Sequence, residues 1–554
     1  MSTIAGAPAE ESVRSGWVLS IALPCLAVTM IMAIPVYSDE IAIHMLKASS
    51  VGNGLMPATL FPQCTSAWAA KIPESHIPGA LVWAALYPSR EAWMIRLSGL
   101  CVAWMVIGLW YLTLRQACPT SWWANRVWAV TFSLSLIGVM PFLLGLTRGE
   151  QQMLLSITVL CLLAVVSRQR LFGPTKSTLA LAAALVASSM LVFAQPKSLF
   201  FLPVAAIAVW TVGRGVGLVL RLGATGLLVI MGYQTYSAAA AYVSCSEDPF
   251  VAQLLGRQGL DMHQPFGAIV SASLANLRAA PAALAGRVGF AESYQSDWLI
   301  GAHNWAIAPA GAVTSWLAYT ILVGAPTVVV ILSSSRVIRR GFDVRDVLAL
   351  GLVFGVVGHL AWYPERILHF YVPGLVIPAL MLALGLSLSA SLSLIRWCQR
   401  ARLCDVGVAL CIFAAVTNGV LCVATYVPQE MQIQRQGETQ AKQHLSTPIW
   451  FRGALDADLA HASAECQIAM DEPHLVVDGS AYTGLVGIPR SIFVYYVDPH
   501  IYGGGIEGNL GGFLQGIGSP GVVVHSENLP GVLEDTSERY GSVACVSAKQ
   551  LDED

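Results

Sequence analysis

The chain has 554 residues, of which 55% are hydrophobic and only 12% are charged. Soluble domains carry about 25% charged residues, so this composition excludes an ordinary soluble protein and predicts many membrane-spanning helices. The formal net charge of −2, without a basic patch, argues against nucleic acid as a partner. Sixteen Trp and sixteen Tyr residues suit a chain with many membrane–water interfaces, where these amphipathic rings collect.

The first apolar run covers residues 17–36, about the length needed to cross a bilayer. It follows Arg14 and lacks a small-x-small cleavage pattern. We therefore expect a retained first helix, not a cleaved signal peptide, after a cytoplasmic N-terminus of residues 1–16. Further spans are predicted at 94–114, 127–146, 152–167, 177–194, 199–213, 216–237, 313–333, 347–362, 371–395 and 406–426. The sequence thus predicts an α-helical polytopic membrane protein with about eleven transmembrane helices in residues 17–426.

The loops between these spans fall into two sets by charge. One set is rich in Lys and Arg and is predicted to be cytoplasmic by the positive-inside rule. Its basic residues are Arg115, Arg126, Arg168, Arg170, Lys176, Arg214, Arg336, Arg339, Arg340, Arg345, Arg396, Arg400 and Arg402. The other set holds the long loops 37–93 and 238–312 and the tail 427–554. These pieces are predicted to lie on the periplasmic side of a bacterial inner membrane, with the N-terminus in the cytoplasm.

The tail 427–554 has the pattern of a small α/β domain. A polar, helix-like stretch at 431–461 is followed by short β-rich runs. The predicted strands are 474–478, 491–498, 521–526 and 542–547. The Gly-rich stretch 502–518 lacks the Lys-Ser/Thr ending of a phosphate-binding loop, so we interpret it as an ordinary long loop.

Four of the twelve cysteines fall on the predicted outer side: Cys64, Cys245, Cys466 and Cys545. An oxidising periplasm permits disulfides between them. Cys466 with Cys545 could tie a helix to the last strand of the tail, and Cys64 with Cys245 could join two outer loops. Free buried thiols remain the alternative, because sequence does not fix connectivity.

Ionisable residues gather where four connections meet the outer surface. They are Asp39 and Glu40; Arg148 and Glu150; Lys197; and Glu365, Arg366 and His369, with Tyr371 beside them. An ionisable group held close to hydrocarbon is costly, which makes it a functional hypothesis by default. For any single residue, an ion pair with a neighbouring charge is an equally good explanation. For the whole set we favour function, because four separate connections contribute charges to the same outer face. Cations there would neutralise a phosphate, and a carboxylate would take a proton from an attacking hydroxyl or amine.

The order of these features resembles the GT-C superfamily of integral-membrane glycosyltransferases, which use polyprenyl-phosphate-linked sugars. The acidic pair of "SDE", Ser38 to Glu40, stands directly after the first span, as it does in that superfamily. "RGEQ" (Arg148 to Gln151) is similar to its Arg-x-Glu-like element, and "QPKSLFFLP" (Gln195 to Pro203) resembles basic–aromatic segments of bacterial members. "WYPERILHFYVP" (Trp362 to Pro373) resembles a late segment that binds lipid phosphate. The likeness covers about residues 17–426 and points to the protein mannosyltransferase and lipid A aminoarabinose transferase-like group, with a GT-C-like fold.

The resemblance implies a role for each of these residues. Asp39 would be the general base that activates the acceptor, and Glu40 would orient substrate or bridge to a phosphate-binding group. The residues implied to hold the donor phosphate are Arg148, Lys197, Arg366 and His369. The residues implied to contact substrate are Glu150, Glu365, Tyr371 and Trp298. For Trp298, anchoring at the membrane interface is the commoner alternative.

The resemblance leaves open whether the protein binds a divalent metal, although no cofactor is expected. Some members of the superfamily need a divalent metal, and the conceivable ligands here are Glu150, Asp297 and His303. No ligand spacing supports such a site, so we predict metal independence. The tail departs from the oligosaccharyltransferase branch, because it lacks that branch's Trp-Trp-Asp element.

The resemblance therefore predicts an enzyme that moves a sugar from a polyprenyl-phosphate donor to a cell-envelope acceptor, which could be a lipid, a glycan or a protein. A transporter or flippase for lipid-linked sugars is the main rival. Transporters, however, tend to place their sites near the bilayer midplane and often contain inverted repeats, whereas this chain shows no internal repeat. An O-antigen ligase or polymerase would also suit the charges, and a scaffold whose tail binds a partner stays open. Membrane lipids are the remaining expected partner.

Overall fold

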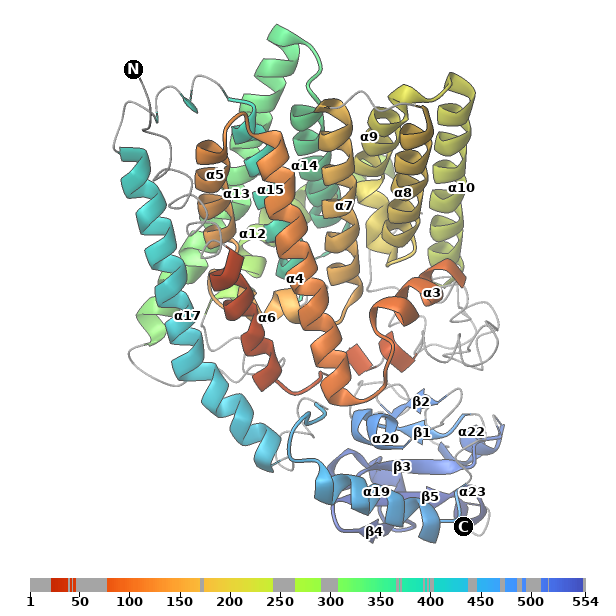
Figure 1. Cartoon of the computed structure of the whole chain (residues 1–554). Coiled ribbons are helices and arrows are strands. Elements are labelled where there is room, and N and C mark those ends of the chain that lie inside the picture. Colours follow the sequence, from red (N-terminus) through yellow and green to blue (C-terminus); the bar gives the residue numbers. More distant parts are fainter. Residues whose placement is uncertain are drawn as a thin grey trace, which may run out of the picture.

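The computed structural model describes most of the chain. The described residues are 21–37, 40, 41, 43–45, 77–169, 174–242, 265–289, 307–364, 368, 371–391, 394, 395, 398, 403–436, 446–468, 474–485, 491–494, 510–516 and 518–551. They form a bundle of long helices with a small α/β domain at one end (Figure 1).

The bundle consists largely of apolar helices. Their bounds are α3 (Ile77–Leu86), α4 (Ala92–Ala117), α5 (Ser121–Leu134), α6 (Met140–Gly145), α7 (Gly149–Gln169), α8 (Pro174–Val192), η4 (Pro196–Phe201), α9 (Leu202–Val212), η5 (Gly213–Gly215), α10 (Leu218–Tyr242), α12 (Phe266–Val288), α13 (Ile307–Arg340), α14 (Val344–Trp362), α15 (Pro373–Ser389) and α17 (Leu403–Gln436). Among the described residues, nine helices are long and apolar enough to cross a membrane, and Ile21–Ala33, which ends in η1 (Met30–Ala33), and α15 are shorter apolar helices. The predicted class, a polytopic helical membrane protein, is confirmed.

Ion pairs mark one end of the bundle. Arg168 in the last turn of α7 pairs with Asp343 at 2.8 Å, and Arg345 donates from Nη1 to the carbonyl oxygen of Ala117 at 2.8 Å. Burial opposes ionisation of Asp343, but the hydrogen bonds from Arg345 and the charges of Arg345 and Arg168 together outweigh it and lower the pKa of that carboxyl. Loops that the sequence predicts to be cytoplasmic therefore meet at this end. We call the other end, which carries the α/β domain, the domain end.

The span predicted at 127–146 is interrupted, which corrects that expectation. α5 and α6 are separate helices, and Gly138 between them has a φ of 56°. An added Cβ at Gly138 would lie 1.8 Å from the carbonyl oxygen of Val288. Asn418 of α17 bonds backbone groups at the break, because its Oδ1 accepts from the N–H of Gly138 at 2.7 Å and its Nδ2 donates to the carbonyl oxygen of Gly138 at 2.9 Å. A buried amide thus satisfies groups that a continuous helix would have paired.

A helix, α12, lies within the segment 238–312, which the sequence predicts as an outer loop. By length and composition alone α12 could cross a membrane, but its contacts show a different course. Asn276 donates from Nδ2 to the carbonyl oxygen of Ala361 at 2.9 Å, close to where α14 reaches the domain end. The carbonyl oxygen of Val288 accepts from the backbone N–H of Val139 at 3.1 Å, just before α6. Both contacts lie in the domain half of the bundle, so α12 packs across that half.

The α/β domain contains a five-stranded sheet in the order β2-β1-β3-β5-β4. The strands are β1 (Val476–Val477), β2 (Ile492–Phe493), β3 (Gly521–His525), β4 (Glu538–Tyr540) and β5 (Val543–Ser547). β1 pairs in parallel with β2 and β3, whereas β5 is antiparallel to β3 and β4. Four strands fall in the predicted runs. β4 was missed because its Glu-Arg pair carries no apolar alternation.

Helices flank this sheet. They are α19 (Gly453–Glu465), α20 (Gly479–Gly484), α22 (Leu510–Gly516) and α23 (Ala548–Leu551), with 3-10 turns at η9 (Ser526–Asn528) and η10 (Gly531–Leu533). α22 lies in the Gly-rich stretch 502–518, so the prediction of a loop there is wrong for that part. The sheet and its helices confirm a small α/β domain in the tail.

A disulfide between Cys466 and Cys545 joins the end of α19 to β5, which is one of the alternatives that the sequence left open. A second disulfide, Cys398–Cys404, links the start of α17 to the segment before it. The other pair considered, Cys64 with Cys245, lies outside the described residues.

Candidate functional site

Half of the predicted site residues belong to the part of the chain that the structure describes. These are Glu40, Arg148, Glu150, Lys197 and Tyr371. The others lie outside the described residues: Asp39, Trp298, Glu365, Arg366 and His369. The conceivable metal ligands Asp297 and His303 lie outside as well. The five described residues fall into two groups at the domain end, one around Glu150 and one around Glu40.

The Glu150 cluster consists of Arg148, Glu150, Gln195, Lys197 and Tyr371. The Nζ of Lys197 lies 2.9 Å from Oε1 of Glu150, and the Nε of Arg148 lies 3.6 Å from Oε2. Gln195 donates from Nε2 to Oε2 of Glu150 at 3.1 Å. Side-chain exposure is 5% for Glu150, 6% for Arg148 and 13% for Lys197, so two cations and an amide surround a carboxylate that is shielded from solvent. Charges at this depth persist only when they are paired.

The ring of Tyr371 brings the two cations together. The Cζ of Arg148 lies 3.5 Å from the ring centroid, and the Nζ of Lys197 lies 5.0 Å from it. Tyr363, at the end of α14, adds a second ring whose centroid is 5.7 Å from the same Nζ. All three distances are within cation–π range, so the negative ring faces partly offset the repulsion between the two cations.

The local sequence explains how these groups meet. η4 begins with Pro196, whose fixed φ suits a helix start, and Lys197 follows at the second position. An added Cβ at Gly149 would lie 2.3 Å from Nε2 of Gln195, so glycine alone leaves room for that amide beside the start of α7. Glu150 lies in the first turn of α7, where the helix dipole favours a negative charge.

The charges of the Glu150 cluster suit an anionic ligand. Its described side chains include two cations, Arg148 and Lys197, on either side of one carboxylate. Arg offers two parallel donors to phosphate oxygens and Lys acts as a point charge. Low solvent exposure strengthens both attractions relative to water.

Glu40 belongs to a second, closed arrangement, the Glu40 cluster of Tyr37, Glu40, Arg96 and Thr147. The Glu40 side chain is fully buried, and Nη1 of Arg96 lies 2.6 Å from its Oε1. Thr147 donates to the same oxygen from its backbone N–H at 2.7 Å and from its hydroxyl at 2.6 Å. Tyr37 donates from its backbone N–H to Oε2 at 3.0 Å. One cation and three neutral donors therefore satisfy this carboxylate.

Arg96 is the residue of this cluster that sequence reasoning missed. It lies fully buried in α4 and donates from Nε to the carbonyl oxygen of Ile34 at 2.9 Å and from Nη2 to that of Pro35. The available signal was a lone arginine inside an apolar span, because such a charge needs a buried partner. The other missed member, Thr147, precedes Arg148 in the chain and so connects the two clusters.

A further polar contact holds the first turn of α7. Tyr87 donates from its hydroxyl to Oε1 of Gln151 at 2.6 Å, and Nε2 of Gln151 donates to the carbonyl oxygens of Gly99 and Leu144, each at 2.7 Å. Burial raises the pKa of Tyr87, and the charge of Glu40 adds to the shift, so the phenol keeps its proton and stays a donor. These bonds fix Gln151 and therefore also the position of Glu150, which precedes it in the chain.

His359 is another buried polar side chain near the cluster. It lies on α14 with 1% of its surface exposed, and its ring centroid is 5.0 Å from that of Tyr363. Neither ring nitrogen has a hydrogen-bond partner among the residues that the structure describes. Sequence reasoning did not single it out, although a histidine in an apolar span was a visible signal.

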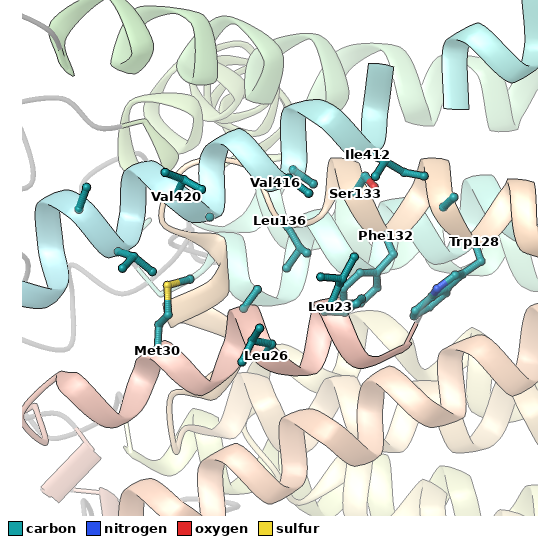
Figure 2. A pocket seen from close by; sticks show the side chains of 17 residues that line it. Leu23, Leu26, Met30, Trp128, Phe132, Ser133, Leu136, Ile412, Val416 and Val420 are labelled. Carbon is teal, nitrogen blue, oxygen red and sulfur yellow. The ribbon is translucent and has the colours of Figure 1, made fainter. Parts of the chain in front are cut away.

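An apolar groove lies apart from these clusters, between Ile21–Ala33, α5 and α17 (Figure 2). Its volume is about 750 Å³, and its wall includes Leu26 and Val416. Among the described residues that line it, polar side-chain atoms come from Ser133 and Trp128, and none is charged. α7, η4, α14 and α15 contribute nothing to this wall, so the groove is separate from the Glu150 cluster. Its chemistry suits a hydrocarbon chain.

No family model matches the sequence, and a search of curated proteins finds no match. Among solved structures, ArnT from Cupriavidus metallidurans bound to undecaprenyl phosphate is 13% identical, with a TM-score of 0.46, and the match covers 97% of this chain and 99% of ArnT. The archaeal oligosaccharyltransferase AglB from Archaeoglobus fulgidus, in complex with an inhibitory peptide and a dolichol-phosphate, is 11% identical, with a TM-score of 0.39. That match covers 92% of this chain and 69% of AglB.

Proposed function

We propose that this protein is a glycosyltransferase that moves a sugar from a polyprenyl-phosphate donor to a cell-envelope acceptor at the periplasmic face of the membrane. The observation that carries this proposal is the Glu150 cluster, where Arg148 and Lys197 share one aromatic ring and one buried carboxylate. Its position at the domain end, where helices leave the apolar region, suits a lipid whose charged head lies at the membrane surface. The acceptor is a lipid, a glycan or a protein.

The charge change during transfer explains why two cations are useful. The donor is a phosphate diester with one negative charge. The bond between C1 of the sugar and the phosphate oxygen breaks, its electron pair leaves with the phosphate, and a new bond forms between C1 and the acceptor atom. The product is a phosphate monoester that carries up to two negative charges. Arg148 and Lys197 would therefore stabilise the transition state more than the bound donor, which is the condition for catalysis.

The acceptor loses its proton in the same reaction, and we assign Asp39 as the base that takes it. A positioned general base contributes about 10²–10⁴-fold to the rate. Glu40 is assigned to hold this segment, because Arg96 and Thr147 already occupy its carboxylate. The remaining assignments stay with the sequence resemblance: Arg366 and His369 for the phosphate, and Glu365, Tyr371 and Trp298 for the substrate.

The position of the Glu150 cluster weighs against the transporter alternative. Transporter sites tend to lie near the bilayer midplane on broken helices. The Glu150 cluster instead lies where α7, η4 and α15 begin and α14 ends, at one end of the bundle. An O-antigen ligase or polymerase remains the nearest alternative, since it would also bind a lipid-linked sugar at this face.

The test uses the full-length protein purified in detergent, with a polyprenyl-phosphate sugar and a cell-envelope extract as acceptor. A transferase releases polyprenyl phosphate although there is no membrane to cross. Product that forms only across sealed vesicles would favour a transporter, and transfer of a whole oligosaccharide repeat would favour a ligase or polymerase. Asp39→Asn should lower release by about 100-fold or more, with protein level and membrane insertion near those of the wild type. Normal release by Asp39→Asn would remove the base assignment.

A further inference from the structure

The segment that carries the acidic pair is bonded to the C-terminal tail just ahead of Ser38. The backbone N–H of Val36 donates to the carbonyl oxygen of Thr447 at 2.8 Å, and the N–H of Thr447 donates to the carbonyl oxygen of Val36 at 2.7 Å. The two residues form an antiparallel bridge, and both are fully buried. The bridge ties the start of the first outer loop to the tail, at the opposite end of the sequence.

Gln434, near the end of α17, ties the same two pieces of chain. Its Nε2 donates to the carbonyl oxygen of Ala33 at 2.5 Å, and its Oε1 accepts from the N–H groups of Ile449 and Trp450 at 3.1 and 2.9 Å. The indole of Trp450 donates to the carbonyl oxygen of Met32 at 2.9 Å. One buried amide thus serves three backbone groups, and the end of the first helix is fixed against the start of the tail domain.

Residues that follow the acidic pair enter the core of the same domain. Ile41 and Met45 belong to one buried hydrophobic cluster with Leu459 of α19. The Nδ1 of His44 lies 2.9 Å from the hydroxyl of Tyr482 on α20, which Figure 1 shows on the side of the domain that faces the bundle. Burial raises the pKa of the Tyr482 phenol, so the phenol keeps its proton. The acidic pair therefore lies, in sequence, between two anchors on the C-terminal domain.

The bundle holds the same segment from the other side. Arg96 and Thr147 bond the carboxylate of Glu40, and neither belongs to the C-terminal domain. Between Val36 and Met45, the described residues are therefore bonded or packed to both parts of the molecule. A segment held in this way loses little further freedom when it meets its substrate, which is how positioning accelerates a reaction.

We propose that the C-terminal domain is a positioning device for the catalytic segment, with Thr447 and Tyr482 as its positioning residues and with Gln434 of α17 supporting the same contact. This inference rests on the proposed function, because it assigns the domain a part in sugar transfer. The domain acts by holding the flanks of the base, Val36 on one side and Ile41 to Met45 on the other. No residue of the domain needs to touch substrate for this effect. A domain that only binds a partner would leave transfer by the purified enzyme unchanged.

The test compares Thr447→Pro with Thr447→Ala in the full-length purified protein. Proline removes the N–H that donates to the carbonyl oxygen of Val36 and keeps the carbonyl oxygen that accepts from the N–H of Val36. Alanine keeps both backbone bonds of the bridge. We expect Thr447→Pro to lower kcat about tenfold, to leave the KM for the donor unchanged and to speed hydrogen exchange in residues 33–45. Thr447→Ala should match the wild type in all three. An unchanged kcat alongside faster exchange in Thr447→Pro would overturn the proposal, as would equal losses of kcat in both variants.

Tyr482→Phe keeps the proposal testable if Thr447→Pro does not fold. It removes the hydrogen bond to His44 but keeps the ring, over which Arg90 lies with its Cζ 5.5 Å from the centroid. We expect a smaller fall in kcat, about threefold, again with an unchanged KM for the donor. A wild-type kcat in Tyr482→Phe would contradict the proposal. Absence of sugar transfer by the wild-type protein would refute the proposed function itself, whereas wild-type transfer with unaffected variants refutes only the positioning role.

Discussion

Glu40 and Glu150 are buried glutamates at the same end of the helix bundle, but their surroundings differ. Glu40 has one cationic partner, Arg96, and its other donors are neutral groups, so the charges of its cluster sum to zero. Glu150 lies between Arg148 and Lys197, and both cations also lie over the ring of Tyr371. A carboxylate with one matched cation holds the fold together. A carboxylate between two cations that lie over one aromatic ring places two positive charges side by side, which suits an anionic ligand.

The largest effect on stability should come from Glu40→Ala. This change leaves the guanidinium of Arg96 buried beside an empty position, and breaking a buried ion pair in this way costs about 3–5 kcal/mol. We expect thermal unfolding in detergent to show this loss. The double variant Glu40→Leu with Arg96→Met removes both charges and should recover much of it, because no unpaired charge remains. A double variant as unstable as Glu40→Ala would show that Glu40 does more than pair with Arg96.

Arg148→Met should have a large effect on binding of the donor phosphate. A hydrogen bond to a charged group contributes about 1.5–3 kcal/mol, so the Kd for polyprenyl phosphate should rise roughly 10–100-fold. Isothermal titration calorimetry on the purified protein measures this. The matched control is Arg336→Met, since Arg336 is a half-buried arginine that pairs with Asp346 at 2.5 Å, at the opposite end of the bundle. It should lose stability and keep the wild-type Kd. Equal losses of affinity in both variants would mean that the effect comes from general destabilisation.

Tyr371→Leu should weaken the same binding by a smaller factor. The aromatic face stabilises two neighbouring cations by about 0.5–2 kcal/mol, which corresponds to a rise in Kd of roughly 2–30-fold. Tyr371→Phe retains the ring and should stay within about twofold of the wild type. A Phe variant as weak as the Leu variant would assign the effect to the hydroxyl, and the account of two cations over one ring would need revision.

The smallest effect should come from Asp343, at the end of the bundle away from the Glu150 cluster. Its pKa is lowered in the folded protein, so its contribution to stability is complete above the usual Asp pKa of about 3.9 and is lost as the pH falls through the folded value. We expect Asp343→Asn to reduce stability at pH 7 by about 1 kcal/mol or less. Unfolding at pH 7 and pH 3 measures this, and the difference between variant and wild type should shrink at pH 3. A variant that is equally destabilised at both values would show that the ionised carboxylate is not responsible.

Much of the bundle could be predicted from sequence because each span is a local apolar run. The exceptions depend on distant residues. The break at Gly138 relies on Asn418 from α17 and on close approach by Val288, and neither is visible within the segment 127–146. α12 is apolar enough to cross a membrane, yet its course depends on contacts to α14 and to Val139.

The sequence predicted which residues gather at the candidate site, but it did not predict which of them form ion pairs with one another. The sequence placed Arg148, Glu150 and Lys197 at one edge, because each follows or precedes an apolar span. It did not show that Lys197 pairs with Glu150, since the two come from different helices. The sequence also did not indicate that Arg96 belongs to the site. Its partner, Glu40, lies far from Arg96 in the sequence, on the other side of a long loop.

The central claim is that Lys197, together with Arg148, binds the donor phosphate and does not serve merely as a structural partner of Glu150. Affinity for polyprenyl phosphate tests this claim most directly. The two variants to compare are Lys197→Met and Glu150→Gln, in the full-length purified protein. Glutamine keeps an acceptor for Lys197 and removes a negative charge that opposes the ligand. We predict a Kd at least about tenfold higher for Lys197→Met and a Kd equal to or lower than wild type for Glu150→Gln. Equal weakening by both variants, or no change in Lys197→Met, would contradict the account.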